Sequence, residues 1–472
     1  MNIRLPAIAA ALCFAASTPV WSAVNGWTGI GPTGGTVNKI VYNPSTPSIV
    51  YAIAAGGFYR SQDGGVSWQL TLSGFYNSPQ DLAVDPSNPS RVYVVEPNYP
   101  YLYVSTDGGA TLTAVTTLPA AVSTAWQIAV GQNGSIVYLT SGMQVFRSTD
   151  RTSTWQQRTS VGTYSAARVL HLSIDPTDSN TLYASATTSA TDSGIFVSHD
   201  GAMTWQLLTS GAEATSFSSG FAINAANSSQ IWSAQYDGVW FSGNKGASWT
   251  NVFATGVTAI AIDPSNSNVL YAGTPYGHVF RTADAGVTWI DVTGNNSAGQ
   301  FTCIAVNPSE SAQVLTGGLG GLSGTSTSGT QWSTQTTGLD STTILGLSAD
   351  PVADRIYMNV SSGGVYFSSA GGVTTTAVNN AGSGGLLSLS GQSILNVTSM
   401  LAQPGLLSAS LSNGLALSAD GGNTWSQVQL AASGAPGQVF AFASSAANPQ
   451  TILAALSTTL VRSVDAGATW VQ

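Results

Sequence analysis

The sequence predicts an all-β fold, a β-propeller built from four-stranded antiparallel blades. An eight-residue box of the pattern Ser-x-Asp-x-Gly-x-Thr-Trp recurs every 40–50 residues along the chain. A similar sequence pattern, typical of two strands joined by a turn, precedes several of these boxes. Eight of the 13 tryptophans occupy the last position of a box, which chance would not produce. A fixed period of this length with four short strands per unit is typical of propeller blades.

The box occurs ten times, and three copies lack the aspartate. The copies are Ser61–Trp68, Ser105–Leu112, Ser148–Trp155, Ser198–Trp205, Ser242–Trp249, Thr282–Trp289, Thr325–Trp332, Ser368–Thr375, Ser418–Trp425 and Ser463–Trp470. Asn244, Thr327 and Ala370 stand where the other copies have aspartate. The sequence therefore predicts ten blades, of which three tolerate the loss of the carboxylate.

The strands of each unit can be placed around its box. A segment with the pattern of Leu82–Val95 recurs at Leu172–Ser185, Ile260–Gly273 and Ile304–Gly317. Its centre, Asp-Pro or Asn-Pro followed by Ser, is a turn signal between two apolar runs. A third strand such as Gly57–Ser61 leads into the box, and the box tryptophan opens a fourth strand.

The repeated aspartates are predicted to be structural. A carboxylate in a tight turn accepts backbone N–H groups, and glycine permits the positive φ that such a turn requires. The tryptophan is expected to pack between neighbouring blades. A residue that recurs in most units does not mark a single active site. This prediction covers Asp63, Asp107, Asp150, Asp200, Asp284, Asp420 and Asp465.

The two ends of the chain bear on how the ring closes. Only Val471 and Gln472 follow the last box, while residues 25–30 resemble the start of a fourth strand after a box. Trp27 would then lie beside the box at Ser463 and remove an open sheet edge. We therefore favour one ring of ten blades. The series of box spacings also hints at a duplicated set of five, so two five-bladed rings remain the alternative.

The first 23 residues predict an export signal, and residues 24–472 the propeller. Arg4 precedes the apolar run Ala7–Ala16, and the small residues Ser22 and Ala23 offer a cleavage site. This run is too short to anchor the chain in a bilayer. We expect a secreted or periplasmic monomer that does not insert into membranes.

The charge of the chain excludes one class of partner and favours others. Charged residues make up 7% of the sequence, and the net charge is −9. Twelve scattered Lys and Arg cannot form the basic stripe that nucleic acid binding requires. The expected partner is an extracellular or periplasmic protein or glycan. Cys303, alone after signal removal, is expected to be a buried strand residue, and no metal or cofactor is predicted.

The boxes resemble the Asp-box (BNR) repeat superfamily over essentially the whole mature chain. That superfamily includes sialidases, xyloglucan-specific endoglucanases, the sortilin ectodomain and a photosystem II assembly factor. The resemblance implies a propeller, and ten blades in one ring is the sortilin-like arrangement, in which a wide channel captures peptides. The fold does not by itself imply a function.

The first blade is similar to that of the xyloglucanases, with one departure. The resemblance lies in Lys39–Ala52 and in the following Gly56, Gly57, Tyr59 and Arg60. Those enzymes place a catalytic aspartate just before the glycine pair, where this chain has Ala54 and Ala55. The converging arginines of sialidases also have no clear counterpart, because Arg60, Arg147, Arg281 and Arg462 share one repeat position.

Candidate site residues are those that the repeat does not explain, in loops on the face opposite the boxes. Asp192, Glu213 and Asp237 are the candidate catalytic carboxylates, since they fall in neighbouring units and hydrolysis of a glycan needs two. Asp81, Glu96 and Asp340 are further loop carboxylates. Tyr99, Tyr236, Tyr276 and His278 are the candidate ligand-binding residues. Tyr76 and Tyr101 lie in similar loops.

Two functions of different classes follow from these features. Because the matched acid is missing, the sequence favours a secreted, non-catalytic binding or scaffold propeller. The alternative is a secreted glycoside hydrolase, xyloglucanase- or sialidase-like, whose catalytic acids lie at other positions.

Overall fold

The fold is known from a computed structural model. It describes residues 35–471 except 74, 76–77, 163–167, 188–192, 209–217, 297–298, 336–343, 351–354, 361–363, 370–373, 378–393, 400–405, 412–413, 429–438, 445–447, 449, 457–458 and 466–468. Strands β1 to β39 of this described part form ten antiparallel sheets, nine with four strands and one with three. Each sheet uses strands that are consecutive in the chain. The predicted all-β class and the predicted four-stranded blades are confirmed.

We number the sheets as blades 1 to 10 in chain order. Blades 1 to 4 comprise β1 (Val37–Tyr42), β2 (Val50–Ala54), β3 (Gly57–Ser61), β4 (Gln69–Leu72), β5 (Asp81–Val84), β6 (Val92–Val95), β7 (Leu102–Ser105), β8 (Thr113–Ala114), β9 (Ile128–Val130), β10 (Val137–Ser141), β11 (Gln144–Ser148), β12 (Gln156–Gln157), β13 (Val169–Asp175), β14 (Asp178–Thr187), β15 (Ser193–Ser198) and β16 (Gln206–Leu207). Blades 5 to 7 comprise β17 (Ser218–Ile223), β18 (Ile231–Gln235), β19 (Gly238–Ser242), β20 (Thr250–Phe253), β21 (Ala259–Asp263), β22 (Asn266–Gly273), β23 (Val279–Thr282), β24 (Ile290–Asp291), β25 (Phe301–Asn307), β26 (Glu310–Gly318), β27 (Gly321–Thr325) and β28 (Ser333–Thr334). Blades 8 to 10 comprise β29 (Ile344–Asp350), β30 (Arg355–Val360), β31 (Gly364–Ser369), β32 (Thr374–Ala377), β33 (Ile394–Ser399), β34 (Leu407–Leu411), β35 (Gly414–Ser418), β36 (Ser426–Val428), β37 (Val439–Ser444), β38 (Ile452–Leu456) and β39 (Leu460–Ser463).

The box forms the same hydrogen-bonded turn wherever the structure describes it with its aspartate. In blade 1, Oδ1 of Asp63 accepts the hydroxyl of Ser61 at 2.7 Å and the N–H of Ser67 at 2.9 Å. The Ser67 hydroxyl donates to Oδ2 at 2.6 Å, and the N–H of Gly65 donates to the Ser61 oxygen at 2.8 Å. These bonds satisfy both carboxylate oxygens within the turn, as the sequence predicts.

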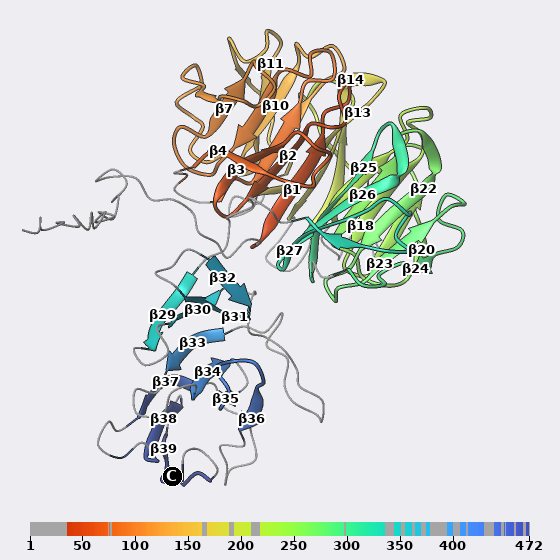
Figure 1. Cartoon of the computed structure of the whole chain (residues 1–472). Helices are drawn as coiled ribbons and strands as arrows, with labels where there is room; N and C mark the ends of the chain where they lie inside the picture. Colours follow the sequence, from red (N-terminus) through yellow and green to blue (C-terminus); the bar gives the residue numbers. More distant parts are fainter. Residues whose placement is uncertain are drawn as a thin grey trace, which may run out of the picture.

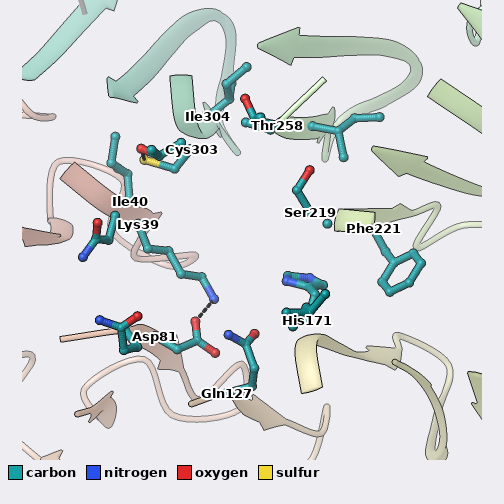
Figure 2. A pocket seen from close by; sticks show the side chains of 17 residues that line it. Lys39, Ile40, Asp81, Gln127, His171, Ser219, Phe221, Thr258, Cys303 and Ile304 are labelled. Carbon is teal, nitrogen blue, oxygen red and sulfur yellow. Dashed lines mark hydrogen bonds and ion pairs between the residues drawn. The ribbon is translucent and has the colours of Figure 1, made fainter. Parts of the chain in front are cut away.

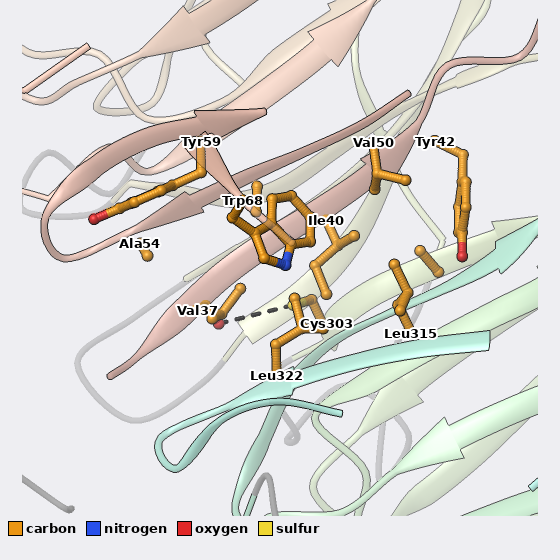
Figure 3. Packing of buried hydrophobic residues seen from close by; sticks show 12 residues of the cluster. Val37, Ile40, Tyr42, Val50, Ala54, Tyr59, Trp68, Cys303, Leu315 and Leu322 are labelled. Atoms are coloured by element: carbon orange, nitrogen blue, oxygen red, sulfur yellow. Dashed lines mark hydrogen bonds between the residues drawn. The ribbon is translucent and has the colours of Figure 1, made fainter. Parts of the chain in front are cut away.

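The ring closes where blade 7 packs on blade 1. Val50 and Trp68 of blade 1 lie in one buried cluster with Leu315 and Leu322 of blade 7 (Figure 3). The Trp68 indole N–H also donates to the carbonyl oxygen of Gln335 at 2.9 Å, so a box tryptophan ties two blades together. β25 contacts β1 along the same junction. Blades 1 to 7 of the described chain therefore form a closed ring, residues 37–334, which we call the ring (Figure 1).

Glycine is required at this junction. Gly65 has a φ of +98°, and a Cβ built on it would lie 2.6 Å from the Leu315 side chain. The box turn of blade 1 can therefore approach blade 7 only with glycine at this position.

Blades 8 to 10 form a second group, which we call the three-blade segment (residues 344–471). β29 packs on β33, and β33 packs on β37. The sequence predicts one ring of ten blades, or two of five, and the structure differs from both. The seven first blades close on themselves, because blade 7 buries its apolar face against blade 1 rather than against blade 8. The predicted pairing of residues 25–30 with the last box lies outside the described residues.

Candidate functional site

Two faces of the ring follow from the order of strands in each blade. The boxes come directly after the third strands, so the seven boxes of blades 1 to 7 lie at one end of the ring. The hairpins between second and third strands turn at the other end, as the pairing of Ala54 with Gly57 and of Gln235 with Gly238 shows. We call this end the loop face.

A cavity of about 220 Å³ opens in the centre of the ring. Residues in or next to the first strands of all seven blades of the ring line it (Figure 2). One repeat position contributes a residue from every blade, namely Lys39, Asp81, Gln127, His171, Gly220, Ala259 and Cys303. Polar groups therefore stand on blades 1 to 4 and small or apolar ones on blades 5 to 7. At this repeat position one side of the cavity is polar and the other is small or apolar. The volume of the cavity is smaller than that of the pockets that hold drug-sized ligands.

Asp81 connects three blades around this cavity. Its carboxylate accepts the ammonium group of Lys39 from blade 1. It also accepts the N–H of Leu82 at 2.9 Å and, on the other oxygen, the N–H of Ile128 of blade 3 at 2.8 Å. The side chain is buried and both oxygens are satisfied, so Asp81 is held as a structural carboxylate rather than presented to a substrate.

His171 is neutral at physiological pH. Burial, and next the positive charge of Lys39, lower the pKa of its imidazole to about 4, while Asp81 opposes this shift. Its Nε2 lies 3.2 Å from the hydroxyl of Ser173, and its ring packs 5.7 Å from the ring of Phe221.

Cys303 is inert. Burial raises the pKa of its thiol to about 12, and the sulfur lies against the carbonyl oxygen of Val37 at 3.7 Å. A thiol with such a pKa is not a nucleophile at neutral pH. The structure thus confirms the prediction of a small buried strand residue.

Of the predicted catalytic cluster, the structure describes Asp237 alone. Asp192 and Glu213 lie outside the described residues, as do Tyr76 and Asp340. Asp237 is exposed in the hairpin between β18 and β19, where its carboxylate accepts the indole N–H of Trp240 at 3.2 Å. Glu96 is buried at the end of β6 and accepts the hydroxyl of Tyr103 at 3.3 Å.

The predicted ligand-binding residues all lie on the loop face. Tyr99, Tyr236 and Tyr276 are exposed in the hairpins of blades 2, 5 and 6. Blades 5 and 6 are neighbours, so Tyr236 and Tyr276 stand on adjacent hairpins. Tyr99 makes an edge contact with Tyr101, with ring centroids 5.9 Å apart.

His278 follows Tyr276 in the blade 6 hairpin and pairs with a carboxylate that the sequence reading missed. Its Nδ1 lies 2.9 Å from Oδ2 of Asp291, and both side chains are about half exposed. Burial works against the ionised form of Asp291, but hydrogen bonds from Thr293 outweigh it and hold the pKa of this carboxyl below its ordinary value. Asp291 is therefore a carboxylate throughout the neutral range.

Lys39, His171 and Asp291 are site residues that sequence reasoning missed. A signal for the first two existed, because an alignment of the first strands shows Lys39, Asp81, Gln127 and His171 at one repeat position. Asp291 follows a box tryptophan by two residues and carries no signal of its own.

The chain matches known proteins at the level of motif and fold. A model of the Sortilin-Vps10 family (sortilin, neurotensin receptor 3) matches residues 100–238. The solved structure of the GH74 enzyme of Niastella koreensis has a TM-score of 0.69 at 20% identity, over 94% of this chain and 73% of that one. The GH74 xyloglucanase of Xanthomonas campestris has a TM-score of 0.68 at 18% identity, over 95% and 75%. The chain shares the Asp-box repeat and the β-propeller fold with these proteins.

Curated relatives of this Asp-box propeller bear the names of glycan-cleaving enzymes. A xyloglucanase of Paenibacillus is 27% identical over 325 residues, which is 55% of this chain and 31% of that protein. Xyloglucanase Xgh74A of Acetivibrio thermocellus is 25% identical over 331 residues, 56% of this chain and 39% of that protein. The matched segment thus spans about a third of each relative.

These relatives correct the function that the sequence favoured. The sequence predicts a non-catalytic binding or scaffold propeller, because Ala54 and Ala55 replace the acid before the glycine pair. That prediction is contradicted, since the curated relatives that match more than half of the chain are xyloglucanases. The alternative, a glycoside hydrolase, agrees better with these relatives. No helix in the described residues is long and apolar enough to cross a membrane.

Proposed function

We propose that the chain is a secreted glycoside hydrolase that acts on a β-glucan of the xyloglucan type. The observation that carries this proposal is the likeness to xyloglucanases over more than half of the chain. The export signal expected in residues 1–23 is consistent with an extracellular polymer as substrate. The low charge of the chain suits a neutral polysaccharide, whose hydroxyl groups need hydrogen-bonding partners and apolar platforms rather than counter-charges.

The glucan binds on the loop face of blades 5 and 6. Tyr236 and Tyr276 are exposed on adjacent hairpins there, although large aromatic side chains are usually buried. Exposed tyrosines offer flat apolar faces on which sugar rings stack, and their hydroxyl groups remain free to meet the hydroxyls of the glycan.

Hydrolysis requires two carboxyl groups that flank the scissile bond. Asp237 of blade 5 and Asp291 of blade 6 are the exposed carboxylates of the described residues on the loop face of the ring. Asp291, which stays ionised, suits the base or nucleophile, and Asp237 the acid. These two carboxylates would replace the catalytic aspartate of the xyloglucanases, whose position in this chain is occupied by Ala54 and Ala55. Tyr236 precedes Asp237 in the blade 5 hairpin, and Tyr276 lies in the blade 6 hairpin with His278, the partner of Asp291 on β24, so the two tyrosines would hold the polymer near both carboxylates.

The test is the release of reducing ends from xyloglucan by the purified chain. We expect turnover by the unchanged protein, and a loss of roughly 100-fold or more in kcat for Asp237→Asn and for Asp291→Asn, the usual contribution of an acid or base. Asp178→Asn is the matched control, since Asp178 is exposed at the start of β14, at the box end of blade 4, and the substitution should leave kcat unchanged. Absence of turnover by the unchanged chain, or full activity of both variants, would overturn the proposal.

The binding step has its own measurement. Tyr276→Ala should raise KM by roughly 5- to 10-fold with little change in kcat, because a lost stacking contact weakens ground state and transition state alike. A fall in kcat at constant KM would place Tyr276 in the chemistry and contradict its role as a platform.

A further inference from the structure

One pair of repeat positions recurs at every junction of the ring, at the box end. The first, which we call the turn position, ends or directly follows the first strand of a blade. The second is the fourth residue of the box in the next blade. In chain order the pairs are Asn43 and Gly108, Asp85 and Arg151, Gly131 and Gly201, Asp175 and Lys245, Asn224 and Ala285, Asp263 and Ser328, and, at ring closure, Asn307 and Gly64.

The backbone has the same conformation at the fourth box position of all seven blades. Its N–H donates at 2.7–3.1 Å to a carbonyl oxygen at or near the start of the second strand of its own blade. Its φ lies between +55° and +73°, and Arg151, Lys245 and Ser328 adopt this value although it favours glycine. Side chains at this position therefore leave the backbone in the same direction in each blade.

Two acids at the turn position pair with a cation at the fourth box position. Oδ2 of Asp85 lies 3.6 Å from Nε of Arg151, and Oδ2 of Asp175 lies 3.4 Å from Nζ of Lys245. Both carboxylates are fully buried, so each needs a positive charge nearby. At four other junctions the turn position is Asn or Gly, and the fourth box position is Gly or Ala.

The junction of blades 6 and 7 has the acid without the cation. Asp263 is 1% exposed, and its Oδ1 accepts the hydroxyl of Ser265 and the N–H groups of Ser265 and Asn266. Its Oδ2 is the oxygen that faces the cation in the two other acidic junctions. Within the described part of the chain this oxygen has no hydrogen-bond partner, and Ser328 supplies no charge.

The side chains of this protein do not neutralise Asp263. None of the Lys and Arg residues that the structure describes forms an ion pair with it. Arg4 is the one Lys or Arg outside the described residues, and it lies in the expected export signal. A buried carboxylate without a counter-charge is strongly unfavourable, and proteins meet this cost with an ion pair or a bound metal ion.

We propose that a monovalent metal cation, Na⁺ or K⁺, binds at Asp263 and replaces the side-chain cation of the two other junctions. The hydroxyls of Ser265 and Ser311 lie 2.8 Å apart across the junction and add neutral oxygen ligands beside the carboxylate. One carboxylate balances one positive charge. Divalent sites usually gather several acidic ligands, and the described residues bring no three acidic, His or Cys side chains together for a metal ion. This site departs from the expectation of a chain without a metal, and it lies at the box end, away from the loop face.

The test is the thermal unfolding midpoint of the purified chain in NaCl, KCl or tetramethylammonium chloride at equal ionic strength. We expect the midpoint to be roughly 2–4 °C higher in the sodium or potassium salt, because an ion that binds only the folded state stabilises it. Asp263→Asn should remove this difference. The variant should fold, since Asn224 and Asn307 occupy the same position in blades 5 and 7. Equal midpoints for the unchanged chain, a shift that requires CaCl₂, or the same difference in Asp263→Asn would overturn the inference.

Exchanging the two kinds of junction separates the ion from a general effect of salt. Ser328→Lys places an ammonium group where Lys245 has one, and should raise the midpoint in tetramethylammonium chloride and abolish the dependence on Na⁺. Lys245→Ser leaves Asp175 as Asp263 is now, and should roughly double that dependence. Unchanged dependence in either variant would overturn the inference, since the ion would then bind elsewhere.

Discussion

The ring and the three-blade segment are built from one repeat, yet they differ in what covers their end blades. In the ring, blade 7 meets blade 1, so Leu322 and Val50 are buried. In the segment, the equivalent positions at the two ends, Leu460 and Ile356, are exposed. The repeat therefore encodes a blade with an apolar front and an apolar rear face. Each of these faces is buried only where a neighbouring blade packs on it. Stability is a sum over junctions, as in other repeat architectures.

The largest expected effect compares one leucine position in the two regions. Leu322→Ala should reduce the free energy of unfolding by about 2–5 kcal/mol, because it removes buried atoms and leaves a cavity at the closing junction. Leu460→Ala should change it by less than about 0.5 kcal/mol, since the side chain is exposed. Urea denaturation of both variants measures the difference. Equal losses would show that the two positions are not in different environments.

The second expected effect is a pH dependence of stability that is confined to the ring. The ring holds all three histidines of the chain. His171 binds a proton near pH 6.5 when unfolded but only near pH 4 in the ring. The unfolded state therefore binds the proton first, and ring stability should fall by roughly 3 kcal/mol as the pH drops from 6.5 to 4. Hydrogen exchange of β13 should accelerate over this range, while exchange of β38 in the segment should not. His171→Gln should remove the effect, and His199→Gln should leave it; a loss of equal size in both regions would refute the assignment.

The local structure of both regions could be predicted from the sequence, because it depends on residues close together in the chain. The Asp63 turn, the hairpins and the packing of Trp68 between blades follow from the box alone. The number of blades in a ring could not. The boxes at Thr325 and Ser368 are 43 residues apart, as many as separate other boxes within the ring, so no linker marks the boundary between blades 7 and 8. Closure depends on the angles between sheets, which no single residue encodes.

The candidate site was predictable where it departs from the repeat. Tyr236, Tyr276 and Asp237 stand out because they lie in hairpin loops and the repeat does not explain them. The cavity residues Lys39 and His171 were missed because each looks ordinary in its own strand. That both side chains line one cavity becomes apparent only when the first strands are aligned around the closed ring, and the sequence does not show how the ring closes.

The smallest expected effect is shared by both regions and tests whether a box stabilises its blade in the same way in each. Hydrogen bonds from the side chain and backbone of Thr111 lower the pKa of Asp107 in the ring to about 2, and bonds from Thr469 do the same for Asp465 in the segment. Because both folded-state pKa values lie below the ordinary 3.8, the boxes stabilise the fold above that pH, and the contribution disappears as the pH falls towards 2.

Blade 5 already contains the control for this titration. Asn244 accepts the Ser242 hydroxyl at 2.9 Å and the N–H of Ser248 at 2.9 Å, as an aspartate would, but its amide donates to the Ser248 hydroxyl instead of accepting from it. Asp107→Asn and Asp465→Asn should therefore keep the turn at pH 7 and each lose part of the acid sensitivity between pH 4 and 2, while Asn244→Asp should gain it. Urea midpoints at pH 7, 4 and 2 measure these changes. If Asp465→Asn alters the acid response and Asp107→Asn does not, closure of the ring rather than the turn itself limits stability in acid, and the equivalence of the two regions at the level of the box fails.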